Sequence, residues 1–162
     1  MIVVANSTPL IELSKINRLD LLRDVYAKIV IPKEVETEVV IEGAGQPGAA
    51  EVRTATWIEV HAVTDAARVT NLHANTGLGK GECGVIILAE EIDAQRVIID
   101  DRAARQVAQA RGLPLIGTSG VLVVAKTRGI IPNVKDIMDH LRAHGSRIGQ
   151  GLYQQILNVA GE

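Results

Sequence analysis

The sequence VIIDDR (residues 97–102) decides the fold class of this chain, because an apolar run there ends on two adjacent carboxylates. Three β-branched residues, then acids, then the helix-like sequence AARQVAQAR predict a buried strand that delivers Asp100 and Asp101 to the carboxyl edge of a sheet. Open α/β sheets bind their ligands at that edge. Neighbouring carboxylates repel one another and resist joint desolvation, so the pattern favours a bound cation.

The composition favours one core built from aliphatic side chains. Of 162 residues, 47% are hydrophobic, so we expect a single domain over residues 1–162. With no Phe, one Trp and two Tyr, the chain has few rings to stack on bases, and any bound nucleic acid would be held through its backbone. The formal net charge of -2 gives no general attraction to polyanions, so such a contact needs a local basic patch or a metal.

The apolar stretches are too short to anchor the chain in a membrane. The opening MIVVANS is shorter than the apolar part of a secretory signal, and charge interrupts the GVIILAEEI run. The lone Cys83 excludes an internal disulfide, and its apolar surroundings indicate a small core residue. We therefore expect a cytoplasmic protein.

Apolar runs separated by helix-like stretches predict an α/β fold with a mainly parallel sheet. The expected strands are residues 2–5, 28–31, 57–63, 96–99 and 114–117, of which the first and fourth lie side by side. Polar residues alternate along the third strand and place it near an edge. The expected helices, on both faces of the sheet, are residues 10–16, 19–25, 33–41, 49–55, 81–92, 102–111, 119–128, 133–144 and 150–160. Ser7 is expected to cap the first helix, and residues 64–80 to form a short helix at most.

Oxygen-bearing side chains follow or begin several of these elements. Asn6 ends the first strand, Glu38 flanks the apolar face of helix 33–41, and Glu82 lies in the first turn of helix 81–92. With Asp100 and Asp101, they would bring hard oxygen ligands from four segments to one edge. Mg²⁺ and Mn²⁺ prefer such ligands, and a bound metal can activate water for attack on a phosphodiester.

Each of these residues also has a purely structural interpretation. Glu82 would favour a helix N-terminus, Glu38 would be a solvated flank residue, and Asn6 would cap a turn. Asp101 would cap the next helix and pair with Arg105. Only their joint placement at one edge favours a metal site.

Positive side chains fall close to the same edge. Lys80, Arg102 and Arg105 are candidates to hold substrate phosphates, and Arg147 could return there from the C-terminal segment. Ion pairs with the neighbouring acids are the alternative role for each.

A dinucleotide-binding protein is a minor alternative. Gly79, Gly81 and Gly84 satisfy G-x-G-x-x-G, with an acid at roughly the spacing of a ribose contact. That motif must follow a strand directly, whereas residues 71–76 here are mostly polar.

Five pieces of sequence, in this order, resemble the PIN-domain proteins, and the resemblance covers nearly the whole chain. They are VVANSTPLI (3–11), IPKEV (31–35) leading to Glu38, LGKGE (78–82), IIDDR (98–102) and IGT (116–118). The chain looks closest to the small bacterial and archaeal branch DUF3368, akin to VapC-type toxins. The resemblance implies a three-layer α/β/α fold and a Mg²⁺- or Mn²⁺-dependent ribonuclease that hydrolyses RNA with metal-activated water. It also implies a homodimer and inhibition by an antitoxin protein; aliphatic positions such as Leu13, Leu21 and Leu22 suggest a dimer face.

The resemblance assigns catalytic roles to Asn6, Glu38, Glu82 and Asp101, with Asp100 joining Asn6, Glu82 and Asp101 as metal ligands. Two positions depart from the family. It has Asp where this chain has Asn6, and commonly a second Glu where this chain has Gly84. Asn keeps a carbonyl oxygen but loses the charge. The alternative is therefore a catalytically impaired PIN-like module that binds nucleic acid or protein.

Overall fold

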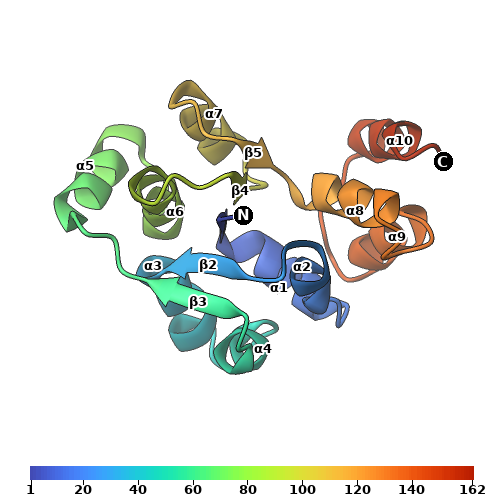
Figure 1. Ribbon diagram of the computed structural model, residues 1–162, viewed down its shortest axis with the longest axis horizontal. Helices are drawn as coiled ribbons and strands as arrows, with labels where there is room; N and C mark the ends of the chain where they lie inside the picture. The colour runs from blue at the N-terminus through green and yellow to red at the C-terminus, as the bar shows by residue number, and fades with distance from the viewer.

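A five-stranded parallel sheet forms the centre of the molecule in the computed structural model, which describes all 162 residues (Figure 1). The strands are β1 (Val3–Ala5), β2 (Ile29–Pro32), β3 (Ile58–His61), β4 (Arg96–Ile98) and β5 (Leu115–Ile116). Their order is β3-β2-β1-β4-β5. The expected fold class is confirmed: β1 pairs directly with β4, and β3 lies at an edge.

Helices cover both faces of the sheet and complete a three-layer α/β/α arrangement. The helices are α1 (Ser7–Lys15), α2 (Asp20–Tyr26), α3 (Lys33–Glu36), η1 (Thr37–Glu42), α4 (Ala49–Thr54), α5 (Ala66–Thr76), α6 (Lys80–Glu91), α7 (Arg102–Ala110), α8 (Thr118–Thr127), α9 (Lys135–Ala143) and α10 (Gln150–Val159). In Figure 1, α5 to α7 lie on one side of the sheet and α1 to α4 on the other, with α8 and α9 packed beside α2 and α1. From α6 onward, each helix begins and ends within two residues of its predicted bounds.

Helix α5 is longer than the sequence suggested, and the expectation of a short helix at most was wrong. The Asp65 side chain accepts a hydrogen bond from the Ala67 N–H at 3.1 Å and caps the helix. Gly77 ends it in the left-handed conformation with φ 74°. Val69 and Leu72 are its buried residues. Two apolar positions three residues apart are enough to dock a capped helix, although its remaining surface is polar.

The predicted helix 33–41 changes its winding midway. Residues Lys33–Glu36 are α-helical, whereas Thr37–Glu42 form the π-helix η1. Val35 and Val39 are buried, as the apolar pattern predicted. Single π-turns are often found at functional sites, and this one carries Glu38.

The first helix begins at Ser7, three residues before its expected start at residue 10. Asn6, rather than Ser7, occupies its N-cap position, and its side chain makes no capping hydrogen bond. Asn6 therefore lies between the end of β1 and the start of α1, at the carboxyl edge of the sheet.

The hydrophobic core joins the sheet to both helical layers in one cluster of 42 buried residues. Leu13, Leu21 and Leu22 are fully buried in this core. The inference of a dimer face from these three residues was therefore wrong. No helix of the structure is both long and apolar enough to cross a membrane.

Candidate active site

Asn6 and Asp101 lie at the same edge of the sheet. They follow the neighbouring parallel strands β1 and β4, and the Asn6 N–H donates to the Ile98 carbonyl at 3.0 Å. The central requirement of the predicted site is thus met, because the carboxyl ends of parallel strands meet at one edge.

The Asn6 side chain presents a buried acceptor that no protein donor satisfies. Only 4% of the residue is exposed, and Oδ1 has no hydrogen-bond partner. Leaving a buried polar group unpaired costs about 1–3 kcal/mol. The expected turn-capping role is not seen, so this oxygen is available to a ligand.

Glu38 is held in place by two other elements. Its Oε2 accepts a hydrogen bond from the Ser7 hydroxyl at 2.8 Å. A Cβ at Gly81 would overlap Glu38 Oε1 and lie 2.7 Å from its Cδ. The glycine in the first turn of α6 therefore makes room for this carboxylate, and α1, η1 and α6 meet there.

Glu82 lies close enough to other acids for its titration to change. Burial is the main cause that raises its pKa, and the negative charge of Asp101, a hydrogen bond with Asp101 and the charge of Glu38 raise it further. A backbone hydrogen bond from Gly79 acts in the opposite direction. Its Oε2 is buried without a hydrogen-bond partner.

The two adjacent aspartates have different environments. Asp101 Oδ2 accepts the Ala104 N–H at 2.9 Å and so caps α7, as the structural interpretation predicted. Asp100 accepts hydrogen bonds from the Thr118 N–H at 2.7 Å and from the Thr118 hydroxyl at 2.6 Å. Asp100 thus connects the end of β4 to the start of α8, whereas Asp101 adjoins Glu82.

Arg105 does not pair with Asp101, and that part of the structural interpretation was wrong. Its Nη1 donates to the Ile99 carbonyl at 2.7 Å. This contact supports the chain between β4 and the two aspartates.

Glu34 is a candidate site residue that sequence reasoning missed. Its Oε2 is buried and has no hydrogen-bond partner. A Cβ at Gly84 would lie 2.9 Å from that oxygen. The Glu34 carboxylate therefore fills space beside Gly84, the position that commonly carries a second Glu in the resembling family. A spacing in the sequence could have identified Glu34. Glu34 and Glu38 are four residues apart, and the glycines that they contact, Gly84 and Gly81, are three residues apart.

The oxygens at this edge fit a hard divalent cation. Asn6 Oδ1, Glu34 Oε2 and Glu82 Oε2 are all buried acceptors without donors. No three His, Cys, Asp or Glu side chains lie close enough together to hold a metal by themselves. Mg²⁺ usually takes only one or two protein carboxylates and keeps several waters, so Glu82, Asp101 and the Asn6 amide form a suitable set.

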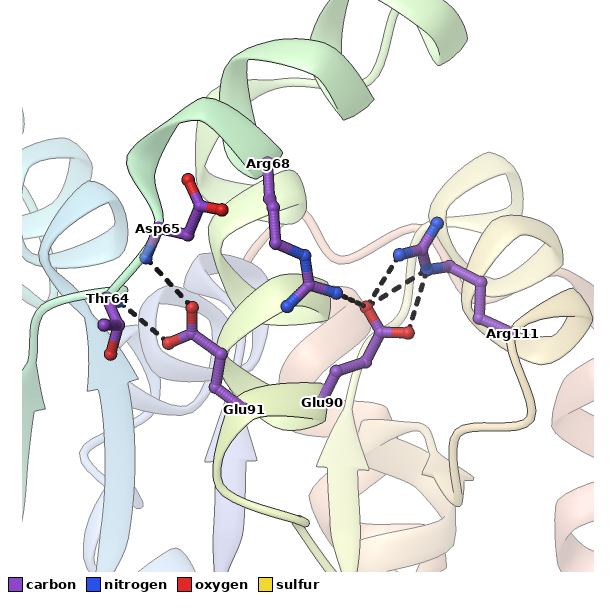
Figure 2. A network of polar contacts seen from close by, with 6 residues as sticks. All are labelled: Thr64, Asp65, Arg68, Glu90, Glu91 and Arg111. Carbon is purple, nitrogen blue, oxygen red and sulfur yellow. Dashed lines mark hydrogen bonds and ion pairs between the residues drawn. The ribbon is translucent and has the colours of Figure 1, made fainter.

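The carboxylates at the two ends of α6 differ in their hydrogen-bond and ion-pair partners. At its C-terminal end, Glu91 accepts the backbone N–H groups of Thr64 and Asp65, and Glu90 pairs with Arg68 at 3.0 Å and with Arg111 at 2.7 Å (Figure 2). These two carboxylates join α6 to α5 and to the end of α7. Glu82, at the other end, keeps an unpaired oxygen, which is the pattern of a binding group rather than a structural one.

Cations beside the acids remain free of carboxylate partners. Lys80 and Arg102 form no ion pair, so the alternative role proposed for them is not seen. Lys80 and Lys33 line an open cavity of about 800 Å³ together with Glu34 and Glu38. The groove thus offers both carboxylates and unpaired positive charge.

The structure removes the dinucleotide alternative. Helix α5 and a short loop precede Gly79, where the motif requires a strand. Glu34 and Glu38 fill the space beside Gly84 and Gly81 that a pyrophosphate would need.

Comparison with known proteins identifies the family. A search of curated proteins gave no match. The family model DUF3368, described as a PIN domain, matches residues 2–162. The parallel sheet, its helices on both faces and the acids at its carboxyl edge agree with that match. This chain belongs to the PIN-domain family and is a nuclease-like module.

Proposed function

We propose that this protein is a Mg²⁺- or Mn²⁺-dependent ribonuclease, the toxin component of a toxin–antitoxin pair. Two unpartnered buried oxygens carry the proposal: Glu82 Oε2, whose carboxylate lies near Asp101, and Asn6 Oδ1 at the same edge of the sheet in a PIN-type fold. Buried acceptors without donors and mutually repelling acids are both relieved by a bound cation.

Glu82, Asp101 and Asn6 would hold the cation, and Asp100 would orient this edge through Thr118. When bound, the cation supplies Lewis-acid activation for phosphodiester hydrolysis. Glu38 is the candidate general base. The Ser7 hydroxyl orients this carboxylate through Oε2, and the carboxylate would take a proton from the attacking water.

Lys80 and Arg102 are the candidate phosphate contacts, because neither is neutralised by a carboxylate of this chain. Arg105 is a weaker candidate, since one of its nitrogens already donates to the Ile99 carbonyl. Few aromatic rings are available, so recognition would use the RNA backbone more than base stacking.

Two of the remaining proposals, the single domain and the location, rest on the composition of the chain, and the other two rest on the family. A toxin of this kind would be a single-domain cytoplasmic protein over residues 1–162, would form a homodimer, and would be inhibited by an antitoxin protein that enters the acidic groove.

The second candidate function is a binding module without catalysis. The observation that favours it is the neutral amide of Asn6 together with the absence of any three acids arranged as a metal site. Such a protein would keep the fold and the groove but would hold RNA or protein without cleaving it.

An RNA cleavage assay separates the two functions. Single-stranded RNA is incubated with Mn²⁺ and the wild-type chain, Asp101→Asn or Glu36→Gln. Asn caps a helix as well as Asp, so Asp101→Asn removes a charge while keeping the α7 cap. Glu36 is on α3, two residues from Glu38, and its side chain forms no ion pair or hydrogen bond.

We expect cleavage by wild type and Glu36→Gln, and none by Asp101→Asn or with EDTA. Wild-type protein that binds RNA but leaves it intact would favour the binding module. Cleavage by Asp101→Asn at the wild-type rate would contradict the proposed site.

A further inference from the structure

A second cavity adjoins the acidic edge, and we propose that it binds one nucleotide unit of a single-stranded RNA, with Arg147 holding the phosphate. This inference rests on the proposed function, because it describes how the substrate chain continues beyond the site of cleavage. The unit concerned lies next to the scissile bond.

The cavity lies between α1, the start of α8 and the segment that joins α9 to α10. Its volume is about 340 Å³, within the usual range of roughly 300–1,000 Å³ for small-ligand sites. Thr8 and Asp100 line it, and these are the immediate neighbours of Ser7 and Asp101. An RNA strand bound at the carboxylates of the sheet edge could therefore extend directly into the cavity.

Contacts within the protein fix the wall that carries Arg147. The Arg142 side chain donates two hydrogen bonds to the Ile148 carbonyl, at 3.0 and 2.8 Å, and lies 3.9 Å above the Tyr153 ring. The Ser146 hydroxyl donates to Glu12 on α1. Arg147 thus lies between two anchored neighbours, and the cavity needs little reorganisation to bind a ligand.

Of the three charged side chains that line the cavity, only the cation Arg147 has no partner. Arg147 is the one cation that lines it, is exposed, and makes no hydrogen bond or ion pair. Both lining carboxylates already have donors, because Lys15 and Ser146 contact Glu12 and Thr118 contacts Asp100. A guanidinium without a partner is the preferred side chain for a phosphate group.

The rest of the lining suits the other parts of a nucleotide. Leu141, Ile148 and Leu152 offer apolar contacts to a base, and Thr8 and Ser119 offer hydroxyls to a sugar. The lining is mostly polar, and this disfavours an apolar side chain of a protein partner as the occupant. The mixture of one free cation, hydroxyls and three aliphatic side chains therefore favours a nucleotide.

The test measures RNA binding without cleavage. Fluorescence anisotropy follows a labelled single-stranded RNA bound to the full chain in EDTA, with wild type, Arg147→Ala and Ser119→Leu, which fills the cavity. Arg53→Ala is the control, because Arg53 is also exposed and unpaired but lies on α4, away from this cavity.

We expect Arg147→Ala to weaken RNA binding about tenfold or more, the usual effect of losing a hydrogen bond to a charged group. It should also reduce the slope of log K against log salt by about 0.7, the value for one phosphate contact on a single strand. Ser119→Leu should weaken binding and Arg53→Ala should not.

Failure of this inference is distinguishable from failure of the proposed function. Binding that depends on Arg147 supports the cavity even if the RNA is never cleaved. RNA cleavage with the same KM in Arg147→Ala and wild type would contradict RNA binding in the cavity and would still support the proposed ribonuclease activity. Wild-type affinity and salt slope in both cavity variants would also overturn it, and would favour a protein side chain as the occupant.

Discussion

Asn6 places a neutral amide where the family has a carboxylate, and its buried Oδ1 has no donor. Asn6→Asp adds a negative charge to the edge that carries Glu82 and Asp101. Without metal we expect a loss of roughly 1 kcal/mol of unfolding free energy, the size of one pKa unit of like-charge coupling. With Mn²⁺ the added charge strengthens binding, so the metal should stabilise the variant more than wild type.

Thermal melts in EDTA and in millimolar Mn²⁺ measure both effects. We expect wild type to have the higher melting temperature in EDTA. In Mn²⁺ we expect Asn6→Asp to have the higher one, or the difference between the two proteins to become smaller. Equal metal responses in wild type and Asn6→Asp would mean that position 6 does not contact a cation.

Glu82 gives the stability of the metal-free protein a pH dependence. Its pKa in the folded chain is raised above the ordinary value of 4.5, chiefly by burial and by Asp101. The unfolded chain therefore loses this proton first, and the contribution of Glu82 to stability falls as pH rises from 4.5 through the folded pKa. Glu82→Gln should stabilise the protein above the folded pKa, and the gain should shrink toward acid pH. Urea unfolding in EDTA from pH 4 to 8 measures this, and a gain that does not vary with pH would contradict the assignment.

At the scale of elements, the close approach of α3 and η1 to α6 depends on two glycines. Gly81→Ala puts a Cβ where the Glu38 carboxylate lies and forces it away from Ser7. Ala is a better helix former than Gly by about 1 kcal/mol, so stability should change little while RNA cleavage falls.

Gly151→Ala in α10 is the matched control, because a Cβ there meets nothing within 4 Å. It should stabilise the helix and leave cleavage unchanged. Equal cleavage rates in the Gly81 and Gly151 variants would show that the position of Glu38 is unimportant for the reaction.

The same elements show how far sequence alone could reach. Strand β4 and helix α6 were predictable because a β-branched run and a long apolar helix bury continuous surface. Helix α5 was not, since its stability comes from one cap and two buried residues. The π-turn at Thr37–Glu42 was also hidden, because the i,i+4 spacing of Val35 and Val39 is compatible with an ordinary α-helix.

The candidate site could likewise be predicted only in part from the sequence. Parallel strands end at one edge, so placing Asn6 and Asp101 together needed only the strand order. The contacts of Ser7 with Glu38 and of Glu34 with the space at Gly84 needed helix packing distances that no spacing encodes. The carbonyl contact of Arg105 was hidden for the same reason.

At the scale of the whole molecule, the two ends of α6 have different expected roles: one end holds neighbouring helices together and the other binds a ligand. Its C-terminal carboxylates, Glu90 and Glu91, are fully engaged with α5 and Arg111, as Figure 2 shows. Its N-terminal carboxylate, Glu82, retains an unpaired oxygen among other acids. One helix thus offers two carboxylates with opposite expected roles, and the pair provides a test with an internal control.

The measurement that tests the central claim is Mn²⁺ binding, followed by the loss of the free-ion signal in electron paramagnetic resonance. Wild type, Glu82→Gln and Glu90→Gln are compared at equal concentration, after circular dichroism has confirmed that each is folded. The account predicts that wild type and Glu90→Gln bind Mn²⁺ alike and that Glu82→Gln loses most of the binding. Mn²⁺ affinity in Glu82→Gln equal to wild type would contradict a metal site at this edge of the sheet.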